Sequence, residues 1–275
     1  MILLVYSILD IAGVNIAQQI LKHYAFTKAR KIYKKSPLYT ARINGCQIAL
    51  AALQEEAVYA QYIQDDFPDA DLVVFLSRHS SQSGKPTLSV HTPGNFGVAE
   101  FGGAPKIISV APAVAMQTAL KTMIYYKESL SLFDYQVCYE CTHHGPCLKV
   151  PAMFVELGSS PAQWTDTRAA EAVAHSAISA VTAFTVTPSS AVLGIGGTHY
   201  NEKFTTMALA GTASFGHMIP KYAVPDIDAA MIRQCIERTF EKVQLALLDW
   251  KGIRSGDKPG LLFALEAVGL PYQKV

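Results

Sequence analysis

The stretch Asp71-Leu72-Val73-Val74-Phe75-Leu76-Ser77 is apolar almost throughout, and the stretch Pro151-Ala152-Met153-Phe154-Val155-Glu156-Leu157 has the same character. A strand that is covered on both faces of its sheet reads as a nearly continuous apolar run, whereas a strand with one wet face alternates. We therefore predict two buried strands at the centre of a sheet, and we assign the remaining elements around them.

Short apolar segments of strand length alternate with longer segments of helical periodicity around these two runs. Further strands are predicted at 2–8, 46–53, 87–91, 106–110, 135–141 and 190–196. Helices are predicted at 13–23, 112–129, 166–184, 203–210, 228–250 and 258–268. This alternation predicts an α/β fold with a mixed, largely parallel central sheet flanked by helices. Since no internal repeat and no linker divides the chain, we predict a single domain over residues 1–275.

The composition excludes several classes of protein. Half of the 275 residues are hydrophobic and 16% are charged, which excludes intrinsic disorder. The net charge of +1 gives no global sign of a nucleic-acid binder. The apolar start, Met1–Ile8, has no basic region before it and reads as a strand rather than a signal peptide. We expect a cytoplasmic protein that does not associate with a membrane.

Histidines stand at the ends of four of the predicted strands. They are His79, His91, His143 and His199, with His144 next to the third. Glu140 and Glu156 lie at the ends of two strands as well. In α/β sheets, ligands bind beyond the carboxyl ends of the strands. We therefore expect these side chains to converge on one crevice.

Glu140, His143 and His144 place one carboxylate and two imidazoles within five residues. A histidine or a perturbed glutamate supplies a general base near neutral pH, and the same atoms are ligands for Zn²⁺. The other interpretation is a loop whose histidines cap backbone groups. His199 and Glu202 have a spacing that some zinc hydrolases use, but Glu202 is equally typical of a first helical turn.

Three further features have a functional and a structural interpretation. The glycines at 194, 196 and 197 allow either a close approach of the backbone to a ligand or a tight turn after a strand. Lys221 is either a phosphate contact or a solvated surface lysine. Tyr200 either stacks on a base or an amino-acid side chain, or is simply a buried aromatic residue.

A basic window spans residues 11–54, in which there is no acidic residue. It contains Lys28, Arg30, Lys31, Lys34 and Lys35, with tyrosines between them. A local basic patch with aromatic residues binds a phosphate backbone even when the whole protein is neutral. The alternative is a solvated basic hairpin or helix face.

Seven segments, in this order along the chain, carry a family resemblance. They are Ser77–Ser81, Ser83–Pro86, His91–Asn95, Thr142–Pro146, Phe154–Ser160, Gly194–Tyr200 and Gly216–Tyr222. Their residues resemble the motifs of the archaeal and plant type of D-aminoacyl-tRNA deacylase. Cys141 and Thr198 depart from the family pattern, and Glu202 does not belong to it.

The resemblance implies a monomeric, cytoplasmic, archaeal hydrolase that removes D-amino acids from tRNA, with a fold like that of the phosphorylase/peptidyl-tRNA-hydrolase group and with Zn²⁺ as a cofactor. From this resemblance we predict four catalytic residues, which are Glu140, His143, His144 and His199. The predicted zinc ligands are Glu140, His143 and His199. The predicted substrate-binding residues are His79, His91, Asn95, Glu156, Gly196, Gly197, Tyr200 and Lys221. The basic window is predicted to bind the tRNA acceptor stem.

Two alternative functions remain open at this point. A zinc-dependent peptidase or amidohydrolase on a similar fold would use the same histidines, but the basic window argues against it. An RNA-binding module without catalysis would explain the basic window, but the histidines and glutamates at strand ends argue against that.

Overall fold

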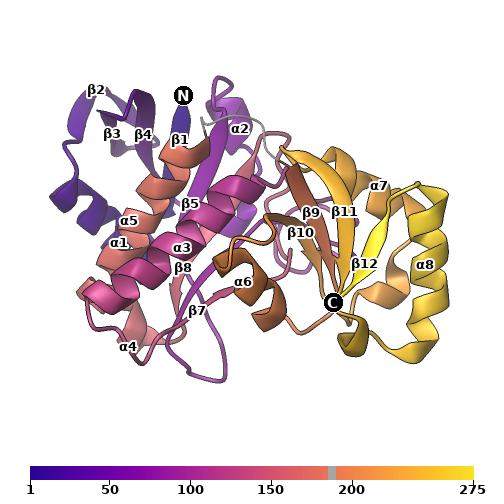
Figure 1. Ribbon diagram of the computed structural model, residues 1–275. Helices are drawn as coiled ribbons and strands as arrows, with labels where there is room; N and C mark the ends of the chain where they lie inside the picture. The colour runs from indigo at the N-terminus through magenta and orange to yellow at the C-terminus, as the bar shows by residue number, and fades with distance from the viewer. Residues whose placement is uncertain (185–189) are drawn as a thin grey trace.

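The computed structural model describes residues 1–184 and 190–275, and these residues form two β-sheets with helices packed around them (Figure 1). The strands of the larger sheet are β1 Ile2–Ser7, β2 Thr27–Tyr33, β3 Ser36–Ile43, β4 Cys46–Leu53, β5 Leu72–Arg78, β6 Thr87–His91, β7 Gln136–Tyr139 and β8 Ala152–Gly158. Their order in the sheet is β2-β3-β4-β1-β5-β8-β6-β7.

The smaller sheet consists of β9 Ser190–Ile195, β10 Phe215–Ile219, β11 Lys242–Leu248 and β12 Tyr272–Lys274. These strands are parallel to one another and stand in the order β10-β9-β11-β12. The α-helices are α1 Ile11–His23, α2 Ile63–Asp66, α3 Ala113–Ser129, α4 Pro161–Trp164, α5 Thr167–Phe184, α6 Glu202–Leu209, α7 Ala229–Glu237 and α8 Lys258–Ala267. Short 3₁₀ helices are η1 Ala57–Tyr59, η2 Val224–Asp226, η3 Trp250–Gly252 and η4 Ser255–Asp257.

The larger sheet is mixed and largely parallel, which confirms the predicted fold class. β4, β1, β5 and β8 run parallel, β6 runs antiparallel to β8, and β7 runs parallel to β6. The two apolar runs of the sequence are β5 and β8, and they pair with each other near the middle of the sheet. They have no polar alternation because both faces of the sheet are covered at this position.

The two faces of this sheet differ. Helices α1, α3 and α5 cover one face, where apolar side chains such as Leu76, Val90 and Val155 are buried (Figure 1). On the other face, η1 and α2 cover Phe75 and Phe154 and the apolar residues around them. Because successive side chains of a strand point to opposite faces, each strand contributes to both layers.

The predicted helix over 228–250 is wrong beyond its first half. α7 ends at Glu237, and β11 follows from Lys242 to Leu248. Val243, Ala246 and Leu248 of this strand are buried in the core of the smaller sheet. The segment is apolar at both the helical and the strand spacing, and its packing against β9 and β12 favours the strand.

The predicted strand at 106–110 does not form. Ile108 and Val110 each make an isolated bridge, to Gly94 and Pro151, and the segment otherwise runs as an extended loop. Strands β2, β3, β10 and β12 and helices α2 and α4 were not predicted as elements, although a basic hairpin was one interpretation of the basic window. The hairpin turns at Lys34 and Lys35, both with positive φ, as a two-residue turn between twisted strands requires.

The two sheets share an apolar cluster. Phe215 of β10 and Phe204 of α6 stack on each other with ring centroids 4.6 Å apart, and Phe215 meets the ring of Tyr139 in β7 edge-on. The single-domain interpretation over residues 1–275 stays a prediction. Within residues 1–184 and 190–275, no helix is long and apolar enough to span a membrane.

Candidate active site

A cavity of about 560 Å³ lies beside the ends of β5, β7 and β8. Seven of the residues predicted as catalytic or substrate-binding line it: His79, Glu140, His143, His144, Glu156, His199 and Tyr200. The structure therefore brings together most of the residues that the sequence placed at strand ends. Their roles remain predictions.

Strand register explains why the cavity is polar. Glu156 of β8 is paired with Ser77 of β5 on one side and with Ser89 of β6 on the other. All three side chains point to the sheet face that α1, α3 and α5 do not cover. A Cβ on Gly158, two residues beyond Glu156, would lie 2.5 Å from the carbonyl oxygen of His79, so only glycine allows His79 to pack here.

Glu140 is the centre of this cluster. It is fully buried, and it has imidazole nitrogens on both of its oxygens: His79 Nδ1 lies 3.1 Å from Oε1, and His199 Nε2 lies 2.8 Å from Oε2. Burial alone would raise the pKa of Glu140, but the hydrogen bond from His199 and the close charge contact with His79 outweigh it and hold the pKa well below its ordinary value. The buried carboxylate is therefore ionised at neutral pH.

His79 is a cation between two carboxylates. Burial would lower its pKa, but the hydrogen bonds to Glu140 and Glu156 raise it to about 11. Its other ring nitrogen lies 2.9 Å from the hydroxyl oxygen of Tyr200. For Glu156, burial raises the pKa to about 7, against the opposing effect of His79. The cluster thus holds one imidazolium, one firmly ionised carboxylate and one carboxyl group that titrates near neutrality.

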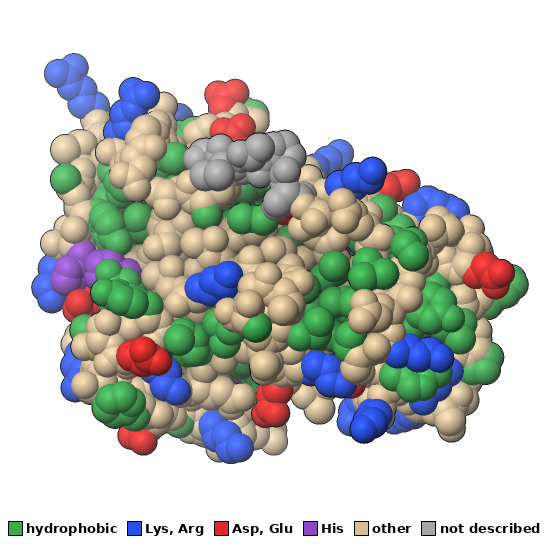
Figure 2. All heavy atoms as spheres, in the orientation of Figure 1, with side chains coloured by type: hydrophobic (Ala, Val, Ile, Leu, Met, Phe, Trp, Pro, Cys, Tyr) green, Lys and Arg blue, Asp and Glu red, His purple; other side chains and the backbone are tan. Residues whose placement is uncertain are grey.

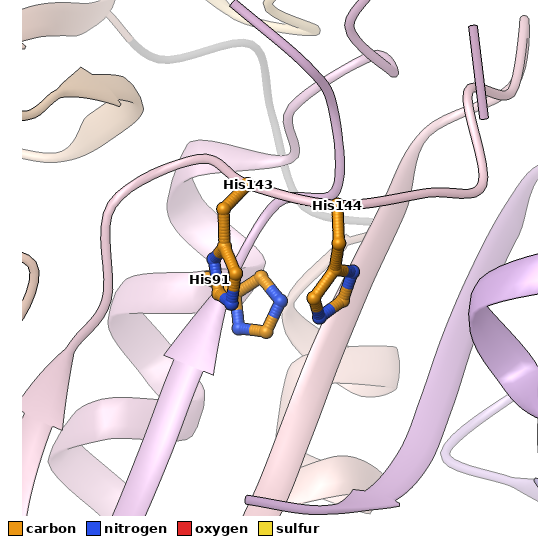
Figure 3. A group of neighbouring side chains, drawn as sticks. All are labelled: His91, His143 and His144. Atoms are coloured by element: carbon orange, nitrogen blue, oxygen red, sulfur yellow. The ribbon is translucent and has the colours of Figure 1, made fainter. Parts of the chain in front are cut away.

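Three imidazoles point toward one another behind this cluster, from the end of β6 and from the loop after β7 (Figure 3). The rings of His91 and His143 have centroids 4.2 Å apart, and those of His91 and His144 are 4.9 Å apart. His91 is completely buried against the ring of Phe154 and, among the described residues, neither of its ring nitrogens has a hydrogen-bond partner. Such an orphaned buried imidazole is unusual in a native protein.

The two loop histidines have a defined tautomer. His143 Nδ1 donates to the carbonyl of Cys141 and His144 Nδ1 donates to the carbonyl of Gly145, each over 2.8 Å. The neutral rings therefore keep their lone pairs at Nε2. Burial lowers the pKa of His144 to about 4 and lowers those of His91 and His143 well below the ordinary value. All three rings are neutral at neutral pH and able to accept a proton or bind a metal.

Three groups of side chains here have the spacing of metal ligands. They are His91, His143 and His144; Glu140, His143 and His199; and His79, Glu140 and Glu156, with the ligand atoms of each group within 4.8 Å of one another. The second group is the ligand set predicted from the sequence. His143 belongs to the first two groups. These groups would therefore bind one ion at either of two adjacent positions, or two ions next to each other.

Asn95 is not among the residues that line the main cavity. It donates through Nδ2 to the carbonyls of Gly102 and Ala104, and so holds the loop in place. It lines an adjoining cavity of about 320 Å³ instead, which shares Phe101, His143 and His144 with the main one. Its Nδ2 is therefore engaged in the structure of the loop, and its predicted role in substrate binding stays a prediction.

Gly196 and Gly197 form a turn and are not among the residues that line the main cavity. Both have positive φ, and a Cβ on Gly196 would lie 3.0 Å from the carbonyl oxygen of Asp249. The amide of Gly196 donates to the carbonyl of Ile219, so it has no free hydrogen for an oxyanion. These glycines fit the tight-turn interpretation.

Lys221 and Glu202 also lie apart from the cluster. Lys221 is exposed, and its backbone amide donates to the carbonyl of Gly197. Glu202 is the first residue of α6 and does not line the cavity, as the helix-start interpretation implies. The neighbour of Lys221, Tyr222, reaches the site instead, since its hydroxyl lies 3.3 Å from His199 Nδ1.

The five named cations of the basic window, residues 28–35, lie on β2 and in the turn of the β2–β3 hairpin, at the edge of the larger sheet. The turn of the hairpin lies beyond the carboxyl end of β4. Ser36, which follows the turn, accepts a hydrogen bond at Oγ from Gln54, the residue after β4. Four strand spacings separate β2 from β5, about 19 Å at roughly 4.8 Å each. Lys34 is exposed but paired with its neighbours: its Nζ lies 3.3 Å from Asp66 and 3.1 Å above the ring of Tyr62.

Sequence reasoning missed Asp10 and the role of the arginine before His79. Asp10 caps α1 by accepting from the amides of Ala12 and Gly13, and its second oxygen accepts from the amide of Arg78 at 2.7 Å. The Arg78 side chain reaches Glu56 on the cavity wall at 3.1 Å. An aspartate directly between a strand and a helix is the signal that could have indicated this cap.

Buried carboxylates and imidazoles around a cavity on an α/β sheet define an enzyme whose site is equipped for hydrolysis. A sequence model of the D-aminoacyl-tRNA deacylase family matches residues 66–273, and the chain belongs to that family. D-aminoacyl-tRNA deacylases of Pyrococcus abyssi and Pyrococcus horikoshii are 32% and 33% identical, over 96% of this chain and 96% of theirs. The deacylase of Methanocaldococcus jannaschii is 37% identical over 77% of this chain and 85% of its own length.

One solved structure is similar over the whole chain. A crystal structure of a conserved protein of unknown function has a TM-score of 0.88 and 29% sequence identity, and the match covers 100% of this chain and 95% of that one. The shared fold includes both sheets, since the match leaves no part of this chain uncovered. Family membership also decides between the functions left open above, because it favours a hydrolase acting on tRNA over a peptidase or a module without catalysis.

Proposed function

We propose that the chain hydrolyses the ester bond between a D-amino acid and the terminal ribose of tRNA, in the cavity centred on Glu140. The observation that carries the proposal is the arrangement of this carboxylate: His79 and His199 bind its two oxygens at 3.1 and 2.8 Å, with the neutral rings of His143 and His144 next to it. The family to which the chain belongs supplies the substrate class.

Ester hydrolysis needs a water molecule, a base that takes its proton, and stabilisation of the tetrahedral oxyanion. His143 or His144 takes the proton at Nε2, because Nδ1 already donates to the backbone in both rings. The imidazolium of His79 and the hydroxyl of Tyr200 provide positive charge and a donor toward the oxyanion. The protonated histidine then returns the proton to the ribose oxygen as the ester bond breaks.

The free α-amino group of the substrate is a cation, and the carboxylates of the cavity attract it. Glu156 is the better candidate, since Glu140 is already occupied by two imidazoles. With the ammonium fixed on one side and the ester carbonyl on the other, the D and L side chains point in different directions. This arrangement would distinguish the two stereoisomers by the space that each side chain finds.

We also propose Zn²⁺ as the cofactor. The fit rests on His91, whose buried nitrogens lack partners among the described residues, and on the free Nε2 atoms of His143 and His144. His143 would hold the ion with Glu140 and His199, as the sequence predicts, or with His91 and His144. The base described above requires the first arrangement, which leaves Nε2 of His144 free, because in the second arrangement both Nε2 atoms would be ligands. A bound zinc ion lowers the pKa of a water molecule and stabilises developing negative charge. In both rings Nδ1 donates a hydrogen bond to a backbone carbonyl, and metal-binding histidines usually have a hydrogen bond of this kind on the nitrogen that does not bind the metal.

The tRNA would lie along the sheet edge between the cavity and the β2–β3 hairpin. The exposed side chains of Arg30, Lys31 and Lys35 contact phosphates, whereas Lys34 is held by Asp66 and Tyr62. Lys221 on the other side of the cavity supplies a further cation. A cytoplasmic location and a monomeric state accompany this proposal, since aminoacylated tRNA is found in the cytoplasm and the cavity is complete within one chain.

The test compares D-tyrosyl-tRNA and L-tyrosyl-tRNA at equal concentration. We expect turnover of the D form alone, and His143→Ala should lower it by at least about 100-fold, the lower range for an acid–base group. Equal rates for both stereoisomers, or full activity in the variant, would show that the proposal is wrong. Zinc is tested separately: metal content is measured after chelation, and the metal-free protein should lose activity that added Zn²⁺ restores.

A further inference from the structure

A second group of metal-ligand type lies outside the cavity, on the helical side of the larger sheet. It consists of His23, the last residue of α1, and of Glu171 and His175 on α5. The three ligand atoms lie within 4.8 Å of one another. In Figure 2, histidine side chains reach the surface on the side where α1 lies in Figure 1.

The spacing on the helices brings these side chains together. Glu171 and His175 are one turn apart on α5 and therefore share a face of that helix. His23 Nε2 lies 3.3 Å from Glu171 Oε2, and His175 Nε2 lies 4.0 Å from Glu171 Oε1. Two ligands of one tetrahedral zinc ion are separated by about 3.4 Å, given bond lengths of roughly 2.0–2.1 Å. Shifts of less than about 1 Å would therefore complete the coordination.

The ring of His175 is fixed in the orientation that a ligand needs. Its Nδ1 lies 2.6 Å from the hydroxyl oxygen of Tyr24, and the ring of Tyr126 stacks on it with centroids 4.1 Å apart and planes at 9°. If Nδ1–H donates to the Tyr24 oxygen, the lone pair of Nε2 points toward Glu171 and His23. Metal-binding histidines generally have such a hydrogen-bond partner on the ring nitrogen that does not bind the metal.

Charge and exposure at this group also suit a metal. Burial, and then the proximity of His23, lowers the pKa of His175, so its ring is neutral at neutral pH. Burial raises the pKa of Tyr24 to about 12, so the phenol stays protonated. The side chains of His23, Glu171 and His175 are 26%, 21% and 14% exposed, which leaves room for water as a fourth ligand.

We infer that His23, Glu171 and His175 form a binding site for a first-row transition-metal dication, with Zn²⁺ as the natural occupant. Two imidazoles and one carboxylate are a donor set that such ions prefer over Ca²⁺ or Mg²⁺. The ion joins the carboxyl end of α1 to α5, far along the chain, and so stabilises the packing of these helices on the sheet. It takes no part in deacylation, because all three ligands lie outside the cavity.

The experiment counts zinc ions bound per chain in the full-length protein and in His175→Ala, by equilibrium dialysis against ZnCl₂ followed by metal analysis. We expect one ion fewer in the variant and unchanged turnover of D-tyrosyl-tRNA, whatever the cavity itself binds. Tyr24→Phe should keep the site but weaken its affinity for zinc by about 10- to 100-fold, as loss of an outer partner does. Glu266→Gln, at an exposed acid on α8, is the matched control and should bind as the wild type does.

Equal stoichiometry in the wild type and in His175→Ala would overturn the inference. If His175→Ala folds poorly, His23→Asn replaces it, because His23 ends its helix and is exposed. Zinc should also raise the melting temperature of the wild type more than that of His23→Asn. An equal rise in both proteins would contradict the proposed link between α1 and α5.

Discussion

The two faces of the larger sheet are built from the same strands, yet they have opposite characters around β6, β7 and β8. In β8, Val155 and Leu157 point into the layer under the helices, while Glu156 between them points into the cavity. In β7 and just beyond it, Tyr139 is in the helical layer and Glu140 in the cavity. The helical layer is apolar, whereas the opposite layer holds carboxylates and imidazoles.

The difference shows how a small protein separates stability from chemistry. Neighbouring residues in a strand have side chains on opposite sides, so core and catalytic groups alternate without interfering. The cavity can then keep buried charges because they pair with one another, as Glu140 does with His79 and His199. Substitutions on the two faces should therefore have different consequences.

The largest effect is expected on the cavity face, from Glu140→Gln. The amide keeps the shape of the side chain but removes the charge that holds His79 and His199 together. We expect the turnover of D-aminoacyl-tRNA to fall by at least about 1000-fold, since several groups lose their alignment at once. Single-turnover kinetics measure this loss, and circular dichroism shows whether the fold persists. A variant that retains a tenth of the activity would contradict the central role of this carboxylate.

The matching change on the helical face is Leu157→Ala, one residue from Glu156. Leu157 is completely buried, so the variant should lose about 2–5 kcal/mol of unfolding free energy. Turnover per folded molecule should change little. Urea unfolding measures the first quantity and steady-state kinetics the second. The comparison of the two faces fails if Leu157→Ala is as stable as the wild type, or if it loses turnover while folded.

A smaller effect is expected from pH. The pKa of His144 falls from its ordinary value of 6.5 to about 4 in the folded protein, chiefly through burial. Between these values the unfolded chain binds a proton that the folded chain does not, so stability is complete above about 6.5 and decreases as the pH falls toward 4. One group contributes at most about 1.4 kcal/mol per pH unit.

Replacement by asparagine isolates this contribution. Urea unfolding from pH 7 to pH 5 should show a flatter decrease for His144→Asn than for the wild type. The raised pKa of Glu156, about 7, acts in the opposite direction, but it does so in both proteins. Parallel pH profiles would indicate that the imidazole is not buried in its neutral form.

The smallest effect is expected at the hairpin, about 19 Å from the cavity by the strand spacing. Reversing Arg30, Lys31 and Lys35 to Glu should raise KM about tenfold and leave kcat unchanged, because remote contacts bind ground state and transition state alike. For each phosphate that the variant no longer binds, the dependence of log affinity on log salt should become flatter by roughly 0.7–0.9.

The control for this variant reverses three exposed lysines away from the hairpin, Lys121, Lys242 and Lys251. It has the same change in net charge and should not alter the salt dependence. An unaltered salt slope in the hairpin variant would place the tRNA elsewhere, and an equal change in both variants would indicate a general effect of charge.

Much of the fold follows from periodicity. β5 and β8 are apolar nearly throughout and are buried on both faces, and a run of this kind is typical of a central strand. The segment 242–248 could not be assigned in the same way, because its apolar residues satisfy a helical and a strand spacing and only the neighbouring β9 decides between them. The strands of the β2–β3 hairpin were not predicted because β2 is largely exposed and carries lysines in place of an apolar stripe, and most of β3 is only half-buried.

The cavity residues were predictable because histidine and glutamate at strand ends are chemically conspicuous. The direction of β6 and β7 in the sheet could not be predicted, because the hydrophobic pattern of one strand does not show how the next strand pairs with it. Asn95 and Gly196 were difficult to assign for a related reason: whether an amide donates to a ligand or to a nearby carbonyl depends on three-dimensional neighbours that the sequence does not show. In both residues, backbone carbonyls are the partners.

The bridge between Glu140 and Tyr200 has a consequence for biosynthesis. The amide of Cys141 donates to the carbonyl of His199, and the amide of Asn201 donates to the carbonyl of Tyr139, so these two distant segments hold each other in place. A ribosome releases the amino-terminal segment first, and the strands of the larger sheet have all emerged by Gly158. The nascent chain can thus assemble its main sheet well before His199 arrives to complete the cluster around Glu140. If His199 acts as proposed, a truncated product of translation that ends before it would present a sheet and a cavity wall to aminoacyl-tRNA, but it would lack one of the two imidazoles that contact Glu140.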